Sequence, residues 1–375
     1  MTDHNLKIAF YAPIKPPDHP IPSGDRLIAG NLVKAMRGAG FSVELASRYI
    51  AYSKRSDREI LTARKTGALE EAARLIEHYQ QIDADKHPDC WVTYHPYCKA
   101  PDWIGPNVAL SLGIPYITIE ACKTGQGDQW LPWRAEAQAG MALADRHLWF
   151  KPMDRDYLKS LPGSDAALSN LPPFIDLEET IQAEPARLPG HWQKETPTII
   201  TVGMMRKGKK VRNFYLIAEI LEDMQDIPWN MVLVGGGPEE DTIRKAYAHI
   251  DPERLHWSGQ VPSCEVPGLM AACDIFMWPG WKEPIGMVYL EAASRGLPVT
   301  AFDNMGVPLV VRNGKTGLLA PLDDIDTFRA NLKILLGDKT LRQKLGNSAK
   351  TFVKQERSMQ AVTMRLTDLL IDICS

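Results

Sequence analysis

The sequence lacks the features that would place it among secreted or membrane-spanning proteins. No apolar run approaches the roughly 18 residues that a membrane span needs, and the N-terminal segment has no hydrophobic signal region. The six cysteines are scattered, with no CxxC pair and no histidine at metal-ligand spacing. Scattered thiols are typical of a reducing compartment. We therefore expect a soluble, cytoplasmic protein.

Several familiar catalytic and binding signatures are also missing. The chain has no GxSxG, HExxH or Walker A motif, no internal repeat and no low-complexity tract. The formal net charge of -3 gives no global attraction to nucleic acid, which we exclude as a partner. Two acidic clusters, 83–85 and 323–326, lie in polar segments at helix ends, where capping and solvation explain them better than a metal. We expect no metal site and no cofactor.

What the chain does have is an alternation of short apolar runs and amphipathic segments in both halves. At 375 residues, the length favours two domains. Buried parallel strands are predicted at 6–12, 41–46, 90–94, 115–119 and 147–150, and then at 198–202, 230–234, 255–257, 274–278, 298–301 and 318–319. Helices between them indicate two doubly wound, Rossmann-like α/β domains.

The predicted boundaries follow from composition. A proline-rich stretch separates the halves, which gives an N-terminal domain over 1–175, a linker over 176–197 and a C-terminal domain over 198–357. The last amphipathic helix, within 358–375, has no strand after it. We expect it to return to the N-terminal domain.

The most informative stretch follows the apolar run 274–278. Glu283 occupies an expected helix N-cap and Pro284 the favoured first helical position, so the sequence predicts a helix over 285–294. A strand, a tight turn and a helix N-terminus form an anion site, because free backbone N–H groups and the helix dipole point outward together. Gly286 would let a ligand approach the backbone there.

Glu291 is the single charged residue between Ile285 and Ala293. We expect it to be half-buried, and a half-buried carboxylate needs hydrogen-bond donors. Sugar hydroxyls are one source. An arginine or a neighbouring loop is the other, and the local pattern does not decide between them.

A basic cluster and a glycine run follow two predicted strands of the second half. Residues 206–212 contain five cations at a strand end, on the sheet edge where residue 283 lies, so they could bind one diphosphate with it. A solvated basic turn is the alternative. The run 235–238 resembles a dinucleotide fingerprint superficially, but Pro238 and the acids after it would repel phosphate. We interpret it as a tight turn beside a ligand.

In the first half, His95, Lys99 and Glu120 end or follow strands and are candidates for the acceptor side of a site. The polar loop 122–129 is a candidate acceptor loop. The basic loop 206–212 and the cations at 54–65 could contact an anionic membrane, although a solvated helix face explains 54–65 better.

The second half resembles the retaining glycosyltransferases of family four, which have the two-domain GT-B fold with domains facing across a cleft. The resemblance covers roughly 150 residues and rests on many motifs in the same order and spacing. They are Val202-Gly203…Lys210, Leu233–Pro238, Trp257–Pro262, Cys273-Asp274, Glu283–Gly286…Glu291, Gly296–Val299, Gly306–Pro308 and Asn313–Leu319.

The resemblance implies a nucleotide-sugar donor bound to the second domain. Glu283 would contact the hydroxyls of the transferred sugar and Glu291 those of the ribose. Arg206 and Lys210 would neutralise the diphosphate, with Lys209 as a substitute for Lys210. Met204 stands where the family usually has an arginine, so the assignment of Arg206 departs from the pattern. The remaining donor-binding positions are Gly203, Gly235, Val261, Pro284, Ile285, Gly286, Met287 and Val288.

The resemblance is weaker in the first half. Ser23-Gly24-Asp25 matches the family's glycine-rich loop with a single glycine, so Gly24 is assigned to the donor and Asp25 to the acceptor side. Glu120 occupies the place of the usual histidine, which leaves His95 one strand earlier as the catalytic candidate.

The function predicted from these features is a metal-independent, retaining transfer of a sugar from a UDP- or GDP-linked donor to a hydroxyl acceptor. A growing glycan or a lipid-linked saccharide would be such an acceptor, reached in the cytoplasm or at the inner face of the membrane. A nucleotide-sugar epimerase on the same fold and a catalytically silent nucleotide-sugar-binding protein are the alternatives. The sequence leaves the oligomeric state open.

Overall fold

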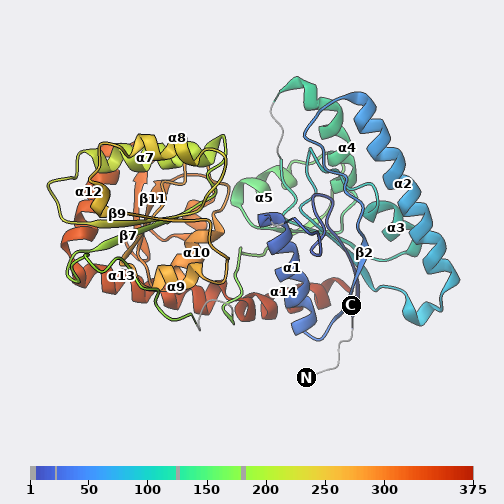
Figure 1. Ribbon diagram of the computed structural model, residues 1–375. Coiled ribbons are helices and arrows are strands. Elements are labelled where there is room, and N and C mark those ends of the chain that lie inside the picture. Colours follow the sequence, from blue (N-terminus) through green and yellow to red (C-terminus); the bar gives the residue numbers. More distant parts are fainter. Residues whose placement is uncertain (1–5, 22, 124–126, 179–182, 375) are drawn as a thin grey trace. The chain divides into compact units, whose positions relative to one another are not determined.

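The chain forms two compact α/β units in a computed structural model that describes residues 6–21, 23–123, 127–178 and 183–374. One unit comprises Met1–Pro172 with Met359–Ser375, and the other Pro173–Ser358. Each unit is built on its own parallel sheet of six strands (Figure 1). This confirms the predicted class of two doubly wound α/β domains.

The first sheet has the strand order β2-β1-β3-β4-β5-β6, and every pairing in it is parallel. Its strands are apolar and buried at the centre, because helices cover both faces. They span Lys7–Tyr11 (β1), Ser42–Ser47 (β2), Cys90–Tyr94 (β3), Tyr116–Ile119 (β4), Arg146–Trp149 (β5) and Ala167–Asn170 (β6).

The helices of the first unit divide between the two faces of that sheet. A cluster of tryptophans, tyrosines and aliphatic side chains packs three of them on one face: α2 (Arg58–Gln81), α3 (Gly105–Leu112) and α4 (Leu131–Ala142). On the other face, α1 (Gly24–Gly38) lies beside α14 (Met359–Cys374), as Figure 1 shows. A shorter helix, α5 (Pro152–Lys159), follows β5.

The second sheet has the order β12-β11-β10-β7-β8-β9 and is also parallel throughout. Its strands span Thr198–Val202 (β7), Asn230–Val234 (β8), Leu255–Gly259 (β9), Ile275–Met277 (β10), Val299–Asp303 (β11) and Gly317–Pro321 (β12). The chain places β8 and β9 on one side of β7 and then β10, β11 and β12 on the other side. The strand order therefore switches between β7 and β10. In open α/β sheets, ligands bind beyond the carboxyl ends of strands at such a switch point.

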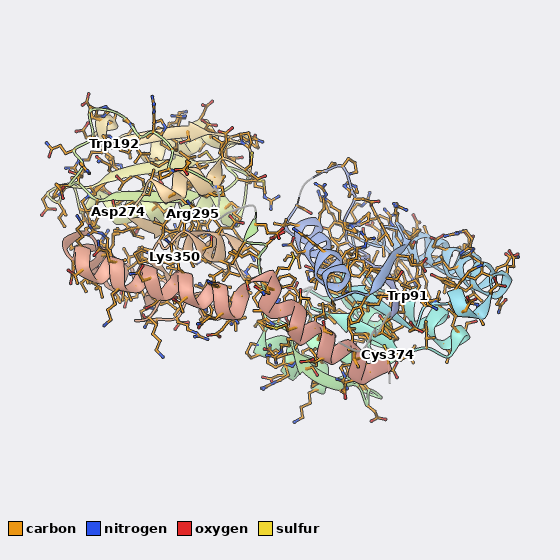
Figure 2. The ribbon with its side chains drawn as sticks, turned by 90° about the horizontal axis from the view of Figure 1, so that it is seen from below. Trp91, Trp192, Asp274, Arg295, Lys350 and Cys374 are labelled. Carbon is orange, nitrogen blue, oxygen red and sulfur yellow. The ribbon has the colours of Figure 1, made fainter. Side chains whose placement is uncertain are left out.

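Helices cover both faces of this sheet as well (Figure 1). One face carries α7 (Lys209–Glu222), α8 (Glu240–Ala246) and α12 (Ile325–Gly337). The other carries α9 (Val266–Ala271), α10 (Met287–Ser294) and α13 (Lys339–Phe352). Arg295, at the end of α10, and Lys350, on α13, are labelled in Figure 2. A short helix, α11 (Val307–Val310), follows β11.

The elements that the sequence did not predict are short or exposed. β6 has no apolar run to predict it, because its alternating small and polar residues leave it only half-buried at the sheet edge. α5 and α11 have eight and four residues, too few for a helical period to show. α7 starts at Lys209, which places two lysines of the basic cluster inside the helix.

The C-terminal helix α14 belongs to the first unit, where Arg146 on β5 bonds Asp372 at 2.8 Å. It ends at Cys374, which Figure 2 labels. Among the residues described, no helix is both long and apolar enough to cross a bilayer.

Candidate functional site

In the second unit, three loops leave neighbouring strands at the same edge of the sheet. They follow β10, β7 and β8, which are adjacent in the strand order. The basic cluster follows β7, the glycine run follows β8, and the turn that contains Glu283 follows β10. The topology therefore brings these three predicted motifs together.

An ion pair links two of these loops. Lys210 Nζ lies 2.9 Å from Glu283 Oε2, and the two side chains are 27% and 15% exposed. The indole of Trp278 lies under both, since its Nε1 donates to the same carboxylate oxygen at 3.4 Å and the ammonium sits 5.1 Å from its ring centroid. A lysine held against an aromatic face and a carboxylate is pre-positioned and partly desolvated.

The first turn of α7 carries Lys209 and Lys210 and no acid. Positive charges at a helix N-terminus oppose the macrodipole, which costs a few tenths of a kcal/mol each. Two lysines and the free amides of that first turn together form a strongly anion-attracting surface. Lys209 Nζ reaches the carbonyl of Lys282 at 3.1 Å, and buried Asn213 accepts from the N–H of Trp281 at 2.8 Å. These bonds fix the helix to the loop after β10.

Arg206 stands apart from this cluster. Its side chain is exposed, and within the described ranges no hydrogen bond or ion pair holds it. The neighbouring Met205 is fully buried and its backbone bonds Gly236, so the loop itself is anchored. The assignment of Arg206 to the diphosphate stays a prediction.

Three glycines let the loops after β7 and β8 approach each other. Gly235 and Gly237 have φ angles of 130° and 148°, and a Cβ on them would collide with the carbonyls of Gly203 and Met205. A Cβ on Gly203 would in turn lie 2.9 Å from the Trp278 ring. The glycine run is therefore a tight turn, as interpreted from the sequence, and it packs against the loop that bears the basic cluster.

The start of α10 differs from the prediction. Glu283 is not its N-cap and Pro284 is not its first residue, because the helix begins at Met287 with Gly286 as the capping residue at φ 79°. The chain turns before that, with Lys282 at φ 52°, and this turn directs the carboxylate of Glu283 to Lys210 instead of to the helix amides. The N-terminal amides of α10 thus remain open to a ligand.

Glu291 lies on α10 and is half-buried, as predicted. Burial raises the pKa of its carboxyl to about 6. Across the described residues no arginine or backbone N–H bonds this carboxylate, which weakens the alternative of a structural ion pair. Its role as a ribose contact stays a prediction.

Val261 follows β9 and lines a cavity of about 560 Å³ with Trp257 and Ser258. The Oγ of Ser258 is buried there and has no hydrogen-bond partner among the described atoms. This cavity lies within the second unit, and its lining also includes Glu184 and Gly268.

In the first unit, Asp25, His95 and Glu120 come together at the carboxyl edge of the sheet. His95 Nδ1 lies 3.0 Å from Asp25 Oδ1, and its Nε2 lies 3.5 Å from the sulfur of Cys122. His95 and Glu120 both directly follow strands and have φ angles of 59° and 56°. Left-handed backbone at two non-glycine residues is strained and is typical of functional sites. Gly24 is the first residue of α1, next to Asp25.

Glu120 is enclosed in a buried network. Its carboxylate accepts from Tyr94 Oη at 3.0 Å and lies 3.4 Å from Lys151 Nζ, which also binds Asp154 at 3.0 Å. Burial opposes the charge of Lys151, but both carboxylates outweigh it and raise the pKa of its ammonium. Glu120 thus forms a structural ion pair with Lys151.

Lys99 lies over the ring of Trp130, 4.6 Å from its centroid, and is half-exposed. The candidate acceptor loop 122–129 lies partly outside the described residues, at 124–126. Of the cations at 54–65, Lys65 binds Glu136, Arg55 binds Asp57 and Arg64 donates to the carbonyl of Ile50. These partners favour the solvated helix face over a membrane contact.

Sequence reasoning missed Trp278, Lys151 and Cys122. Trp278 was assigned to a buried strand, and nothing in a single sequence indicates that its ring would lie against Lys210. Lys151 follows an apolar run, as the other strand-end candidates do, and that position could have revealed it. Cys122 was considered only as a scattered thiol.

Comparison with known proteins matches part of the chain to a family. Residues 184–352 match the family described as Glycosyl transferases group 1. The chain is 27% identical to the GDP-mannose-dependent alpha-(1-6)-phosphatidylinositol monomannoside mannosyltransferase of Mycolicibacterium smegmatis, over 58% of this chain and 59% of that protein. It thus spans about three fifths of the length of the curated relatives that it matches first.

Two solved structures share the fold over nearly the whole chain. Sucrose-phosphate synthase from Thermosynechococcus elongatus superposes with a TM-score of 0.71 at 16% identity, covering 98% of both chains. Anabaena HepE in complex with UDP gives a TM-score of 0.67 at 15% identity, covering 98% of this chain and 100% of that one. The chain therefore has a GT-B fold, and its residues 184–352 form a domain of the glycosyltransferase family Glycosyl transferases group 1.

Proposed function

We propose that the chain is a retaining, metal-independent glycosyltransferase that moves a sugar from a UDP- or GDP-linked donor to a hydroxyl acceptor. The observation that carries the proposal is the Lys210–Glu283 ion pair, set at the N-terminal turn of α7 and in the loop before α10. This arrangement joins a cation, two sets of open helix amides and a carboxylate. A nucleoside diphosphate bonded to a sugar carries the complementary groups.

The difficult step of such a transfer is the departure of the diphosphate from an oxocarbenium-like carbon. Lys210 and the first-turn amides of α7 and α10 would stabilise the negative charge that develops on the leaving phosphate. Glu283 would accept hydrogen bonds from sugar hydroxyls once the donor phosphate competes for Lys210. In a front-face reaction the leaving phosphate takes the proton of the acceptor hydroxyl, so the donor side needs no separate base.

Two features support a nucleotide-sugar donor in particular. Glu291 lies eight positions after Glu283 in sequence, half-buried on α10 and without a paired arginine in the part of the chain described, as suits a ribose diol. The mycolicibacterial relative is named as GDP-mannose-dependent, and Anabaena HepE was solved with UDP. Both nucleotides therefore enter the test below.

For the acceptor, we propose a glycan or a lipid-linked saccharide, reached from the cytoplasm. The exposed cations of 206–212, rather than the paired ones at 54–65, would make the peripheral contact at the inner face of the membrane. The name of the mycolicibacterial relative includes a phosphatidylinositol monomannoside, which is a saccharide on a lipid. Flotation of the chain with vesicles that contain anionic lipid, compared with neutral vesicles, tests the membrane contact.

The reaction is tested by incubating the chain with UDP-glucose, UDP-galactose, UDP-N-acetylglucosamine and GDP-mannose, with EDTA present, both without an acceptor and with methyl α-D-glucopyranoside or methyl α-D-mannopyranoside as the hydroxyl acceptor. Proton NMR follows donor loss and the anomeric coupling of any product. We expect nucleoside diphosphate release from one donor and a product of unchanged anomeric configuration. An epimerised donor would instead support an epimerase, and donor binding without turnover a silent binding protein. Activity abolished by EDTA and restored by Mg²⁺ would contradict metal independence.

A further inference from the structure

At the carboxyl edge of the first sheet, the accessible carboxylate of Asp25 lies beside the catalytic candidate His95. His95 was the catalytic candidate there, but both of its ring nitrogens are occupied. Nδ1 lies 3.0 Å from Asp25 Oδ1 and Nε2 lies 3.5 Å from Cys122 Sγ. The ring also stacks on Tyr97, with centroids 5.2 Å apart. An imidazole with these three contacts is fixed in place and can in turn fix the carboxylate that it contacts.

The charge state of His95 points the same way. Burial lowers its pKa, but the carboxylate of Glu120, the sulfur of Cys122 and the bond to Asp25 outweigh burial and raise the pKa well above 6.5. The carboxylates that act on the ring are thus Asp25 and Glu120. Because these surroundings favour the protonated ring, His95 is poorly suited to accept the proton of an acceptor hydroxyl.

Asp25 has the complementary properties. It lies in the first turn of α1, a helix of 15 residues, where the macrodipole favours a negative charge. Burial raises its pKa, but the bond and the charge of His95 outweigh burial and lower it. Its side chain is 37% exposed, compared with 5% for the carboxylate of Glu120, which Lys151 and Tyr94 already hold.

We propose that Asp25 binds the hydroxyl groups of the acceptor and that His95 is the positioning residue that fixes its carboxylate. A carboxylate bonded on one oxygen to an imidazolium keeps further lone pairs for hydroxyl donors, and such charge-assisted bonds are stronger than neutral ones. The ligand class that fits is an uncharged, hydroxyl-rich group, such as a sugar ring or a polyol. A phosphorylated ring at this position would meet like charge. The inference rests on the proposed function, because an acceptor exists only if the chain transfers a sugar. Its test measures binding alone and requires no transfer.

Binding is tested without turnover, by saturation-transfer NMR on the full chain. The probes are methyl α-D-glucopyranoside, methyl α-D-mannopyranoside and myo-inositol, with glucose 6-phosphate as the charged comparison. Asp25→Asn keeps an oxygen for His95 and removes the charge, and Asp57→Asn is the matched control, since Asp57 is an exposed aspartate paired with Arg55. We expect at least one neutral probe to bind the unchanged chain, roughly tenfold to hundredfold more weakly in Asp25→Asn, and as before in Asp57→Asn.

Equal affinity in Asp25→Asn, no binding by any neutral probe, or preference for glucose 6-phosphate would each overturn the proposal. The positioning role has its own readout, the ¹⁵N shifts of the His95 imidazole. We expect a protonated ring at pH 7 and a lower pKa in Asp25→Asn, whereas a neutral ring at pH 7 in the unchanged chain would refute it. If the polyols bind through Asp25 but no donor sugar is ever transferred, the proposed function fails while the polyol site stands.

Discussion

Replacing Lys210 by methionine separates its charge from its packing. The methionine keeps an unbranched side chain over the Trp278 ring, where the lysine stem now lies, but leaves Glu283 without its cation. If Lys210 stabilises the leaving phosphate, the loss should fall on kcat rather than on the affinity for the acceptor. Removing one group that stabilises developing negative charge typically lowers kcat about 10²- to 10³-fold.

The stability cost of the same change can be worked from the geometry. At 2.9 Å and an effective dielectric constant of about 20, the attraction between the two charges is roughly 6 kcal/mol. Desolvation of two half-buried groups offsets most of it, so we expect a net loss of about 1 to 2 kcal/mol in the free energy of unfolding. The folded population should therefore stay large enough for kinetics.

The assay combines urea unfolding with steady-state kinetics on whichever donor the NMR test identifies. Lys339→Met is a matched control, because Lys339 also lies in the first turn of a helix, 3.8 Å from an acid, but is 68% exposed. We expect the control to be close to the unchanged chain in both measurements. A Lys210→Met protein that is folded and keeps kcat within about threefold would refute the role given to this lysine.

Three further predictions concern other parts of the structure. Burial raises the pKa of Glu291 from 4.5 to about 6, so the ionised carboxylate destabilises the folded chain. This destabilisation is fully present above about pH 6 and absent below about pH 4.5. Glu291→Gln should therefore raise the free energy of unfolding at pH 8 by up to about 2 kcal/mol while weakening nucleotide binding, and an unchanged unfolding midpoint would contradict this. Burial lowers the pKa of His147 from 6.5 to about 4, so the free energy of unfolding decreases as the pH falls from about 6.5 to 4. His147→Gln should flatten that part of the pH–stability curve. A curve of equal slope would count against this prediction. Gly235→Ala should lower the free energy of unfolding by about 2 kcal/mol or more, because φ is 130° and the Gly203 carbonyl blocks a Cβ. The control Gly337→Ala, with open space around it, should change the unfolding midpoint little. Equal midpoints for the two variants would argue against the tight turn.

The fold was predictable because its strands are apolar and its turns carry glycine and proline. Eleven strands were expected and are present, and β6 was missed because it is half-exposed at a sheet edge. The start of α10 was misplaced because Glu283-Pro284 matches a helix start, while the left-handed Lys282 and Gly286 delay the helix. Backbone conformation of this kind depends on packing across the loops, which a single sequence does not display.

The candidate site was predictable in its location but not in its contacts. Strand-end positions identified Lys210, Glu283 and His95, since parallel strands deliver their following residues to one edge. The sequence could not show that Glu283 pairs with Lys210 or that His95 is held by Asp25 and Cys122. These contacts join residues 27, 70 and 73 positions apart, and they decide which groups remain free for a substrate.

The central claim, that the Lys210–Glu283 site holds a nucleoside diphosphate, is tested most directly by calorimetric titration of the full chain with UDP and GDP. The account predicts that one of them binds in the presence of EDTA, that its monophosphate binds more weakly, and that Lys210→Met weakens the diphosphate more than the monophosphate. Equal loss for both nucleotides in Lys210→Met, or no binding of either diphosphate, would contradict it.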